Sequence, residues 1–238
     1  VRPFESQNNL ELWSTEAWYT LNYLPENLPV QHASYNLALN TLTADEEAGG
    51  WKMLFDGSTR SGLRNFNQAG LSSKWVLDGG SIHMTGAGAG DLVVTDETYE
   101  DYEFYLEWKI STGGNSGIIF NAKEGEDFPY PWLTGPEMQI LDNERHPDGQ
   151  IFKHRAGDLY DLIPTKFVTA NGPNEWNRVR IVMKNGNLQQ WLNGYKVVET
   201  QLWDENWKQM VVNSKFKEMP DFGTVKSGHI VLQDHSDK

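Results

Sequence analysis

The sequence predicts an all-β protein, built as a two-sheet jelly roll (β-sandwich) with a short, partly helical N-terminal extension. Short apolar runs with period-two alternation recur after residue 50, turn residues separate them, and almost no helical periodicity interrupts them. The composition agrees, with 22 Gly suited to turns and 10 Trp, 9 Tyr and 10 Phe suited to strands. A chain of 238 residues is long enough to bury a sizeable core in one such domain.

The first 48 residues are predicted to form an extension that packs on the main domain, residues 49–238. Four residues follow helical spacing and predict a short helix over about residues 10–21: Leu10, Trp13, Ala17 and Leu21. A second helix is predicted to begin after Thr43, because three acidic residues follow it and favour the positive end of a helix dipole. Gly49-Gly50 ends this second helix.

The strands are predicted from alternation and from the turns between them. Asp78-Gly79-Gly80 indicates one hairpin, and Asn-Gly pairs at 185–186 and 193–194 indicate a three-stranded meander. Phe104 and Trp108 alternate with polar residues and are assigned to the core. The predicted strands are 74–77, 81–85, 92–95, 102–110, 117–120, 136–141, 178–183, 188–192, 195–202 and 228–232.

The charge balance and the missing residue types exclude several classes of function. The chain has 20 basic and 33 acidic residues, a formal net charge of −13. Nucleic acids and anionic membranes bind clustered Lys and Arg, so neither partner is expected. No apolar run approaches the roughly 18 residues of a membrane span. The chain has no cysteine, which excludes disulfides, thiolate metal sites and cysteine nucleophiles.

The segment from Gly135 to Glu144 carries the strongest functional signal. Alternate strand residues share a face, so Glu137 and Gln139 point together, away from the core. The segment is similar to the Glu-x-Asp-x-x-Glu pattern of concanavalin-like jelly-roll glycosidases, with an amide in the middle and Asp142 last. Ordinary retaining hydrolysis needs two carboxyl groups about 5–5.5 Å apart. Asp142 falls on the opposite face unless a bulge intervenes, so a standard two-carboxylate mechanism is not expected.

Seven blocks of sequence occur in a fixed order after residue 49. They are GWKMLFDG at 50–57, NSGI at 115–118, GPEMQILD at 135–142, GDLYD at 157–161, EWN at 175–177, WLNG at 191–194 and LQDH at 232–235. Together they resemble the 3-keto-disaccharide hydrolase family, which has a concanavalin-like fold. The resemblance implies a bacterial, periplasmic or secreted protein that processes glycosides oxidised at C3.

The chemistry of a 3-keto sugar explains the unusual acid pattern. A ketone at C3 acidifies the C2 hydrogen, so the C1–O bond can break by elimination, followed by hydration. This route needs a base, an acid for the leaving oxygen and a group that stabilises an enolate. Glu137 is the first candidate for this acid/base chemistry and His235 is the second. Gln139, Asn115 or a bound divalent cation would stabilise the oxyanion.

Other polar and aromatic side chains are candidates for substrate binding, because amides contact sugar hydroxyls and aromatic rings stack on sugars. The set is Gln139, Asn115, Lys109, His154, Tyr160, Trp191 and Gln233. Asn115 is also explained as a turn residue, Lys109 as an exposed residue, and Tyr160 and Trp191 as packing residues. His146 and His154 border a polar loop that is a second place for a cation. Their spacing matches no ligand motif, and a solvated loop explains them better.

The leading interpretation is a carbohydrate-active hydrolase that cleaves glycosidic bonds in 3-keto-glycosides or 3-keto-disaccharides. Its predicted partner is an oligosaccharide or glycoside, and its oligomeric state is left open. The alternative is a non-catalytic, lectin-like carbohydrate-binding module, for which a groove of aromatic rings and amides is sufficient. A structural interaction domain is the third interpretation.

Overall fold

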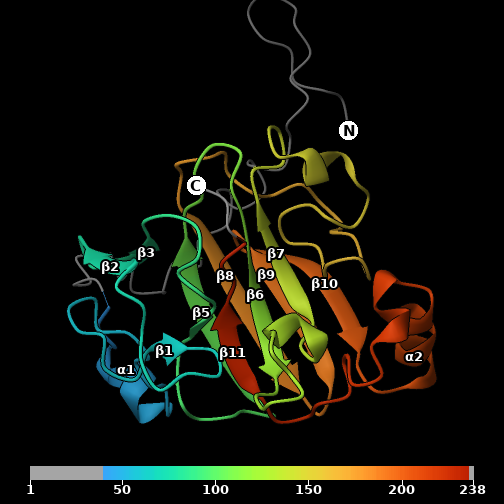
Figure 1. Ribbon diagram of the computed structural model, residues 1–238, viewed down its shortest axis with the longest axis horizontal. Helices are drawn as coiled ribbons and strands as arrows, with labels where there is room; N and C mark the ends of the chain where they lie inside the picture. The colour runs from blue at the N-terminus through green and yellow to red at the C-terminus, as the bar shows by residue number, and fades with distance from the viewer. Residues whose placement is uncertain (1–39, 236–238) are drawn as a thin grey trace, which may run out of the picture. The chain divides into compact units, whose positions relative to one another are not determined.

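Two β-sheets stacked face to face form the core of the chain (Figure 1). The computed structural model describes residues 40–235. By its internal contacts the chain divides after residue 38, and all described residues belong to the second unit. The predicted helix over residues 10–21 lies outside the described residues, and the predicted extension is described only from residue 40.

The first sheet has four antiparallel strands in the order β10-β9-β8-β5. Its strands are β5 (Tyr102–Trp108), β8 (Asn177–Lys184), β9 (Asn187–Leu192) and β10 (Tyr195–Gln201). Both predicted Asn-Gly turns join this meander, and all four turn residues have φ between 50° and 87°. Asn and Gly adopt positive φ at low cost, and two such residues match the twist of a hairpin.

The second sheet has five strands in the order β1-β4-β11-β6-β7. Its strands are β1 (Arg64–Asn65), β4 (Leu92–Val93), β6 (Asn115–Ala122), β7 (Glu137–Leu141) and β11 (His229–Leu232). β7 pairs with β6 so that Gly117 lies opposite Gln139. β11 lies on the other side of β6, with Leu232 opposite Ile118. Segments far apart in the sequence therefore meet in this sheet.

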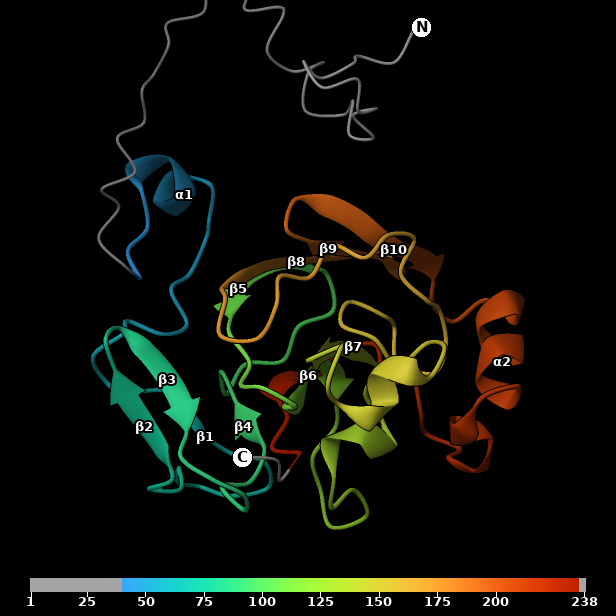
Figure 2. The same ribbon diagram turned by 90° about the horizontal axis from the view of Figure 1, so that it is seen from above.

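The inner faces of the two sheets bury one hydrophobic core, as a β-sandwich requires. In Figure 2, β5, β8, β9 and β10 lie along one layer, and β6 and β7 face its inner side. The core includes Phe104, Trp108, Ile118, Phe120, Met138, Ile140, Val179, Ile181 and Leu192. The predicted assignment of Phe104 and Trp108 to packing is confirmed. The outer face of the second sheet has only a small apolar cluster around Ile119 and Val231, and polar residues flank it.

The smaller elements follow the sequence in part. The predicted hairpin forms as β2 (Trp75–Asp78) and β3 (Ser81–Met84). The predicted helix after Thr43 forms as α1 (Ala44–Ala48), where the Thr43 hydroxyl accepts from the Glu46 N–H at 3.2 Å.

The sequence predicts almost no helix after residue 50, but α2 (Glu205–Val212) lies beside β10 (Figure 1). Only Trp207 of α2 is buried, so its helical periodicity is weak. Three short 3₁₀ turns are η2 (Pro131–Leu133), η3 (Pro147–Gln150) and η4 (Lys215–Glu218). No helix in the described part of the chain is long and apolar enough to cross a membrane.

Candidate active site

The side chain of Glu137 is buried on the outer face of the second sheet, with 6% of its surface exposed. It lies across β6, directly above Gly117. A Cβ atom at Gly117 would overlap the Oε1, Cδ and Cγ atoms of Glu137. Glycine therefore leaves the space that the carboxyl group occupies. Among the described residues, no hydrogen-bond donor reaches this carboxyl group.

Burial raises the pKa of Glu137 to about 8, because removal from water disfavours the charged form. The Lys215 ammonium acts in the opposite direction, and the Asp91 carboxylate raises the pKa further. At pH 7 Glu137 therefore holds its proton. This state suits a proton donor better than a base, although the sequence leaves both roles open.

Three amide side chains that the sequence marks as binding residues surround this carboxyl group. Gln139 and Asn115 lie on the same face of β7 and β6, and both are buried. The Gln233 N–H donates to the Gly117 carbonyl at 2.9 Å, which places Gln233 beside β6. The side-chain oxygens of all three are buried without a hydrogen-bond donor among residues 40–235. Unpaired buried acceptors are costly, so this face suits a ligand with several hydroxyl donors.

A cavity of about 400 Å³ opens beside Gln233. Its volume falls within the range of small-molecule sites. Tyr130 and Trp132 form part of its wall, and their rings stack 5.0 Å apart at an interplanar angle of 7°. Such rings offer a flat apolar surface for a sugar. The other lining residues are Gly88, Gly90, Asp91, Gln233, Asp234 and His235.

Tyr160 links Glu137 to a second group of charged and aromatic side chains. Its backbone N–H donates to the Glu137 carbonyl at 2.9 Å. The Lys215 ammonium lies 3.9 Å from the centre of the Tyr160 ring, and the His154 ring lies 4.3 Å from it. His154 Nε2 is also 3.2 Å from Oδ1 of Asp161. The predicted residues His154 and Tyr160 therefore lie together, on the side of Glu137 that Lys215 approaches.

The Asp142 carboxylate is bound by backbone N–H groups of the surrounding loops. Its Oδ2 accepts from the Gly113 N–H at 2.8 Å, and its Oδ1 accepts from the N–H groups of Glu144 and Arg145. Burial raises the pKa of Asp142, but these hydrogen bonds outweigh burial and hold the pKa below its ordinary value. Asp142 therefore stays ionised and organises the loop after β7.

No group of three or more His, Asp or Glu side chains within residues 40–235 is arranged to hold a metal ion. His146 Nδ1 instead accepts from the Asp148 N–H at 3.1 Å, and its ring packs edge-on against His235 at 6.1 Å. The divalent cation that the sequence left open has no recognisable ligand set there.

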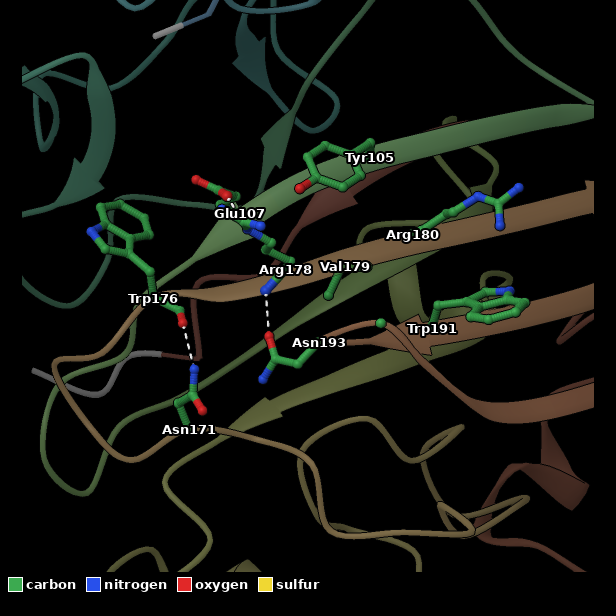
Figure 3. A pocket seen from close by; sticks show the side chains of 10 residues that line it. Tyr105, Glu107, Asn171, Trp176, Arg178, Val179, Arg180, Trp191 and Asn193 are labelled. Atoms are coloured by element: carbon green, nitrogen blue, oxygen red, sulfur yellow. Dashed lines mark hydrogen bonds and ion pairs between the residues drawn. The ribbon is translucent and has the colours of Figure 1, made fainter. Parts of the chain in front are cut away.

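Trp191 lies on β9 of the first sheet and Lys109 directly follows β5, and the structure does not bring either residue to Glu137. Trp191 lines a separate hollow of about 800 Å³ with Tyr105, Trp176 and Arg180 (Figure 3). The Lys109 ammonium lies 5.0 Å from the centre of the Trp176 ring. The structure therefore does not group these two predicted binding residues with Glu137. Alternation shows which residues share a strand face, but it does not show which sheet the strand joins.

Three residues that border this site are not predicted from the sequence: Asp91, Asp234 and Lys215. Asp91 follows a glycine-rich stretch that matches no motif, and Lys215 begins a 3₁₀ turn. Local pattern carries no signal for Asp91 or Asp234, because strand order brings β4 and the end of β11 near β6. It carries none for Lys215 either, because the packing of η4 brings this residue to the Tyr160 ring.

The sequence of residues 50–238 matches the family described as the 3-keto-alpha-glucoside-1,2-lyase-like domain. The chain belongs to this family. It is 31% identical over 227 residues to a 3-keto-disaccharide hydrolase of Bacteroides thetaiotaomicron, a match that covers 84% of this chain and 78% of that protein. The resemblance predicted from the seven sequence blocks is confirmed.

Solved structures agree with this family. A crystal structure described as "a putative glycosyl hydrolase" from Parabacteroides distasonis has a TM-score of 0.77 and 30% identity, covering 83% of this chain and 93% of that one. A second structure with that description, from the same organism, has a TM-score of 0.53 and 22% identity, covering 77% of this chain and 76% of that one. The second likeness supports the fold alone. The predicted jelly-roll fold and the assignment to glycosyl hydrolases are confirmed.

Proposed function

We propose that this protein cleaves 3-keto-glycosides by elimination followed by hydration, with Glu137 as its principal acid/base residue. The buried Glu137 carboxyl group carries the proposal, because it retains a proton near neutral pH on a sheet face with unpaired amide oxygens. A lectin-like module would use the same amides and aromatic rings, but it has no need of such a carboxyl group.

The names of the relatives support this chemistry. The family description refers to a 1,2-lyase, and the curated relative is called a hydrolase. Elimination across C1 and C2 is a lyase reaction, and addition of water to its product completes a net hydrolysis. The two names therefore fit two halves of one reaction.

The reaction balances with two proton-transferring groups. A base takes the C2 proton, and the C–H electron pair forms an enolate with the C3 ketone. The enolate collapses to a C1=C2 double bond, and the leaving oxygen departs with the C1–O electron pair and takes the proton of Glu137. Water then adds to C1, giving its proton to the Glu137 carboxylate, while C2 regains a proton from the base. The products are the 3-keto sugar and the freed alcohol.

The surrounding side chains fit the remaining tasks. The oxygens of Gln139, Asn115 and Gln233 accept from sugar hydroxyls. The Lys215 ammonium interacts electrostatically with Glu137, so its positive charge lowers the energy of a negatively charged intermediate bound nearby. His235 lines the cavity and is the second candidate for proton transfer. The periplasmic or secreted location stays a prediction.

The test incubates the protein with 3-keto-trehalose or 3-keto-lactose and follows the release of 3-keto-glucose. Glu137→Gln is expected to lower kcat about 100-fold or more, because it removes the transferable proton. Glu126→Gln, at an exposed position, is the matched control and should retain activity.

As an acid, Glu137 must be protonated, so activity should fall as the pH rises through about 8. Binding of unoxidised glycans with no turnover of any 3-keto-glycoside would support the lectin-like alternative instead.

A further inference from the structure

We infer that Asp91 is the base that removes the C2 proton, acting on a 3-keto sugar ring held in the cavity beside Gln233. Glu137 then protonates the leaving oxygen from the other side of that ring. The inference rests on the proposed function and assigns the role that it leaves open.

Strand order places the two carboxyl groups on one face of the sheet. Asp91 immediately precedes β4, where Val93 points to the outer face, and alternation directs Asp91 to that face as well. The Glu137 carboxyl group lies above Gly117 of β6, and β11 separates β6 from β4. Two strand spacings amount to roughly 10 Å, so a sugar ring fits between the two groups.

The hydrogen bonds of Asp91 orient it and leave one oxygen available. Its Oδ1 accepts from the Asp234 N–H at 2.8 Å. Its Oδ2 has no hydrogen-bond partner within the described part of the chain, and Asp91 lines the cavity. Asp234 Oδ2 in turn accepts from the Gly90 N–H at 2.8 Å, which holds the segment before β4 against the end of β11. The position of the free oxygen is therefore well defined.

The charge states of the pair support these roles. Burial raises the pKa of Asp91 to about 6, and the Asp234 carboxylate adds to this rise. At pH 7 Asp91 is therefore mostly ionised while Glu137 holds its proton. A base and an acid with pKa values separated in this way are in the states that elimination needs.

At the end of the reaction both carboxyl groups return to their starting protonation states. Asp91 takes the proton from C2 and returns it to C2 when water adds, and Glu137 gives a proton to the leaving oxygen and recovers one from that water. No oxidant, reductant or further proton donor is required. The stacked rings of Tyr130 and Trp132 form one wall of the cavity that holds the sugar.

The test measures the two proton transfers separately: isotope exchange reports removal of the C2 proton, and product release reports protonation of the leaving oxygen. In D₂O, NMR of recovered 3-keto-trehalose measures exchange at C2, and product release measures C1–O cleavage. Asp91→Asn keeps an oxygen for the Asp234 N–H and should lower both exchange and cleavage about 100-fold or more. Glu137→Gln should retain C2 exchange and lose cleavage. Asp78→Asn, at an exposed position of β2, is the control.

A substrate with a good leaving group sharpens the distinction. 4-Nitrophenyl 3-keto-glucoside needs no acid at the leaving oxygen, so Glu137→Gln should cleave it within about tenfold of the wild-type rate. The Asp91→Asn variant should still cleave it about 100-fold or more slowly, because the C2 proton must be removed from either substrate. The reverse pattern would assign the base to Glu137 and overturn the inference.

The wild-type protein provides an independent measurement if Asp91→Asn does not fold. Its C2 exchange rate should rise as the pH passes through about 6. The other titratable groups around Asp91 are Asp234 and His235, which line the same cavity after β11, and Glu137 on β7. An exchange rate that is flat between pH 5 and 7 contradicts the assignment. A wild-type protein that cleaves no 3-keto-glycoside contradicts the proposed function itself.

Discussion

At the scale of single residues, Glu137 occupies an environment that opposes its charge. A buried carboxyl group without hydrogen bonds contributes little to folding, and ionising it costs free energy. Gly117 shows that the fold makes room for this group, since any larger residue would displace it. A position that costs stability is expected where a side chain performs chemistry.

Glu137→Gln should stabilise the fold by an amount that grows with pH. The folded-state pKa of Glu137 is raised from 4.5 to about 8, so its contribution to stability is fully present below about 4.5 and is lost as the pH rises through about 8. The neutral amide avoids this loss, and the difference above pH 8 should be on the order of a few kcal/mol. Urea unfolding from pH 4 to 9 measures it. A constant difference across this range would contradict the raised pKa, and Glu126→Gln serves as the exposed control.

At the scale of elements, the pairing of β6 with β7 creates the site. Gln139 pairs with Gly117 and Glu137 pairs with Ile119, so one register sets the positions of the carboxyl group and its nearest amide. The chain after α2 adds Lys215, whose backbone N–H donates to Oδ2 of Asp161 at 2.7 Å. Although only Trp207 of α2 is buried, the chain that follows this helix places the Lys215 ammonium near the strand that holds Glu137.

Gly117→Ala tests the pairing of β6 with β7. The added methyl group must displace the Glu137 side chain, so kcat should fall about 100-fold or more, because misplaced catalytic groups are ineffective. Alanine loses less backbone entropy than glycine when a strand forms, so thermal unfolding and circular dichroism should show that the variant still folds. The matched control is Gly172→Ala, since no atom lies within 4 Å of a Cβ at that position. Full activity of Gly117→Ala would show that the position of the carboxyl group is not critical.

At the scale of the whole molecule, the sandwich separates the aromatic residues into three environments. Phe104 and Trp108 pack between the sheets, Tyr130 and Trp132 border the cavity of the second sheet, and Trp191 lies in the hollow of the first sheet. The two sheets carry different surfaces because alternation sends every second residue outward from the core. The proposed chemistry uses only the face of the second sheet.

Substitutions at two tryptophans distinguish these surfaces. Trp132→Ala should raise KM for 3-keto-trehalose about tenfold, because stacking on an aromatic ring contributes roughly 1 kcal/mol beyond burial. Trp191→Ala, on the first sheet, should leave kcat and KM within about twofold of wild type. Steady-state kinetics on both variants checks the assignment. An equal rise in KM for both variants would show that the first sheet also binds the substrate.

Local sequence patterns were sufficient to predict the fold class, the family and the strand that carries Glu137 and Gln139. Strand alternation and Asn-Gly turns are local signals, so they predicted the meander, and Glu137 and Gln139 were identified together because two neighbouring strand positions on one face carry an acid and an amide. The sheet that each strand joins depends on long-range pairing, which local patterns do not show. Strand order separated Trp191 and Lys109 from Glu137 and brought Asp91 toward it, while the 3₁₀ turn after α2 brought in Lys215. Neither Asp91 nor Lys215 lies in a local sequence motif. The pKa of Glu137 likewise depends on burial, a property of packing between segments distant in the chain.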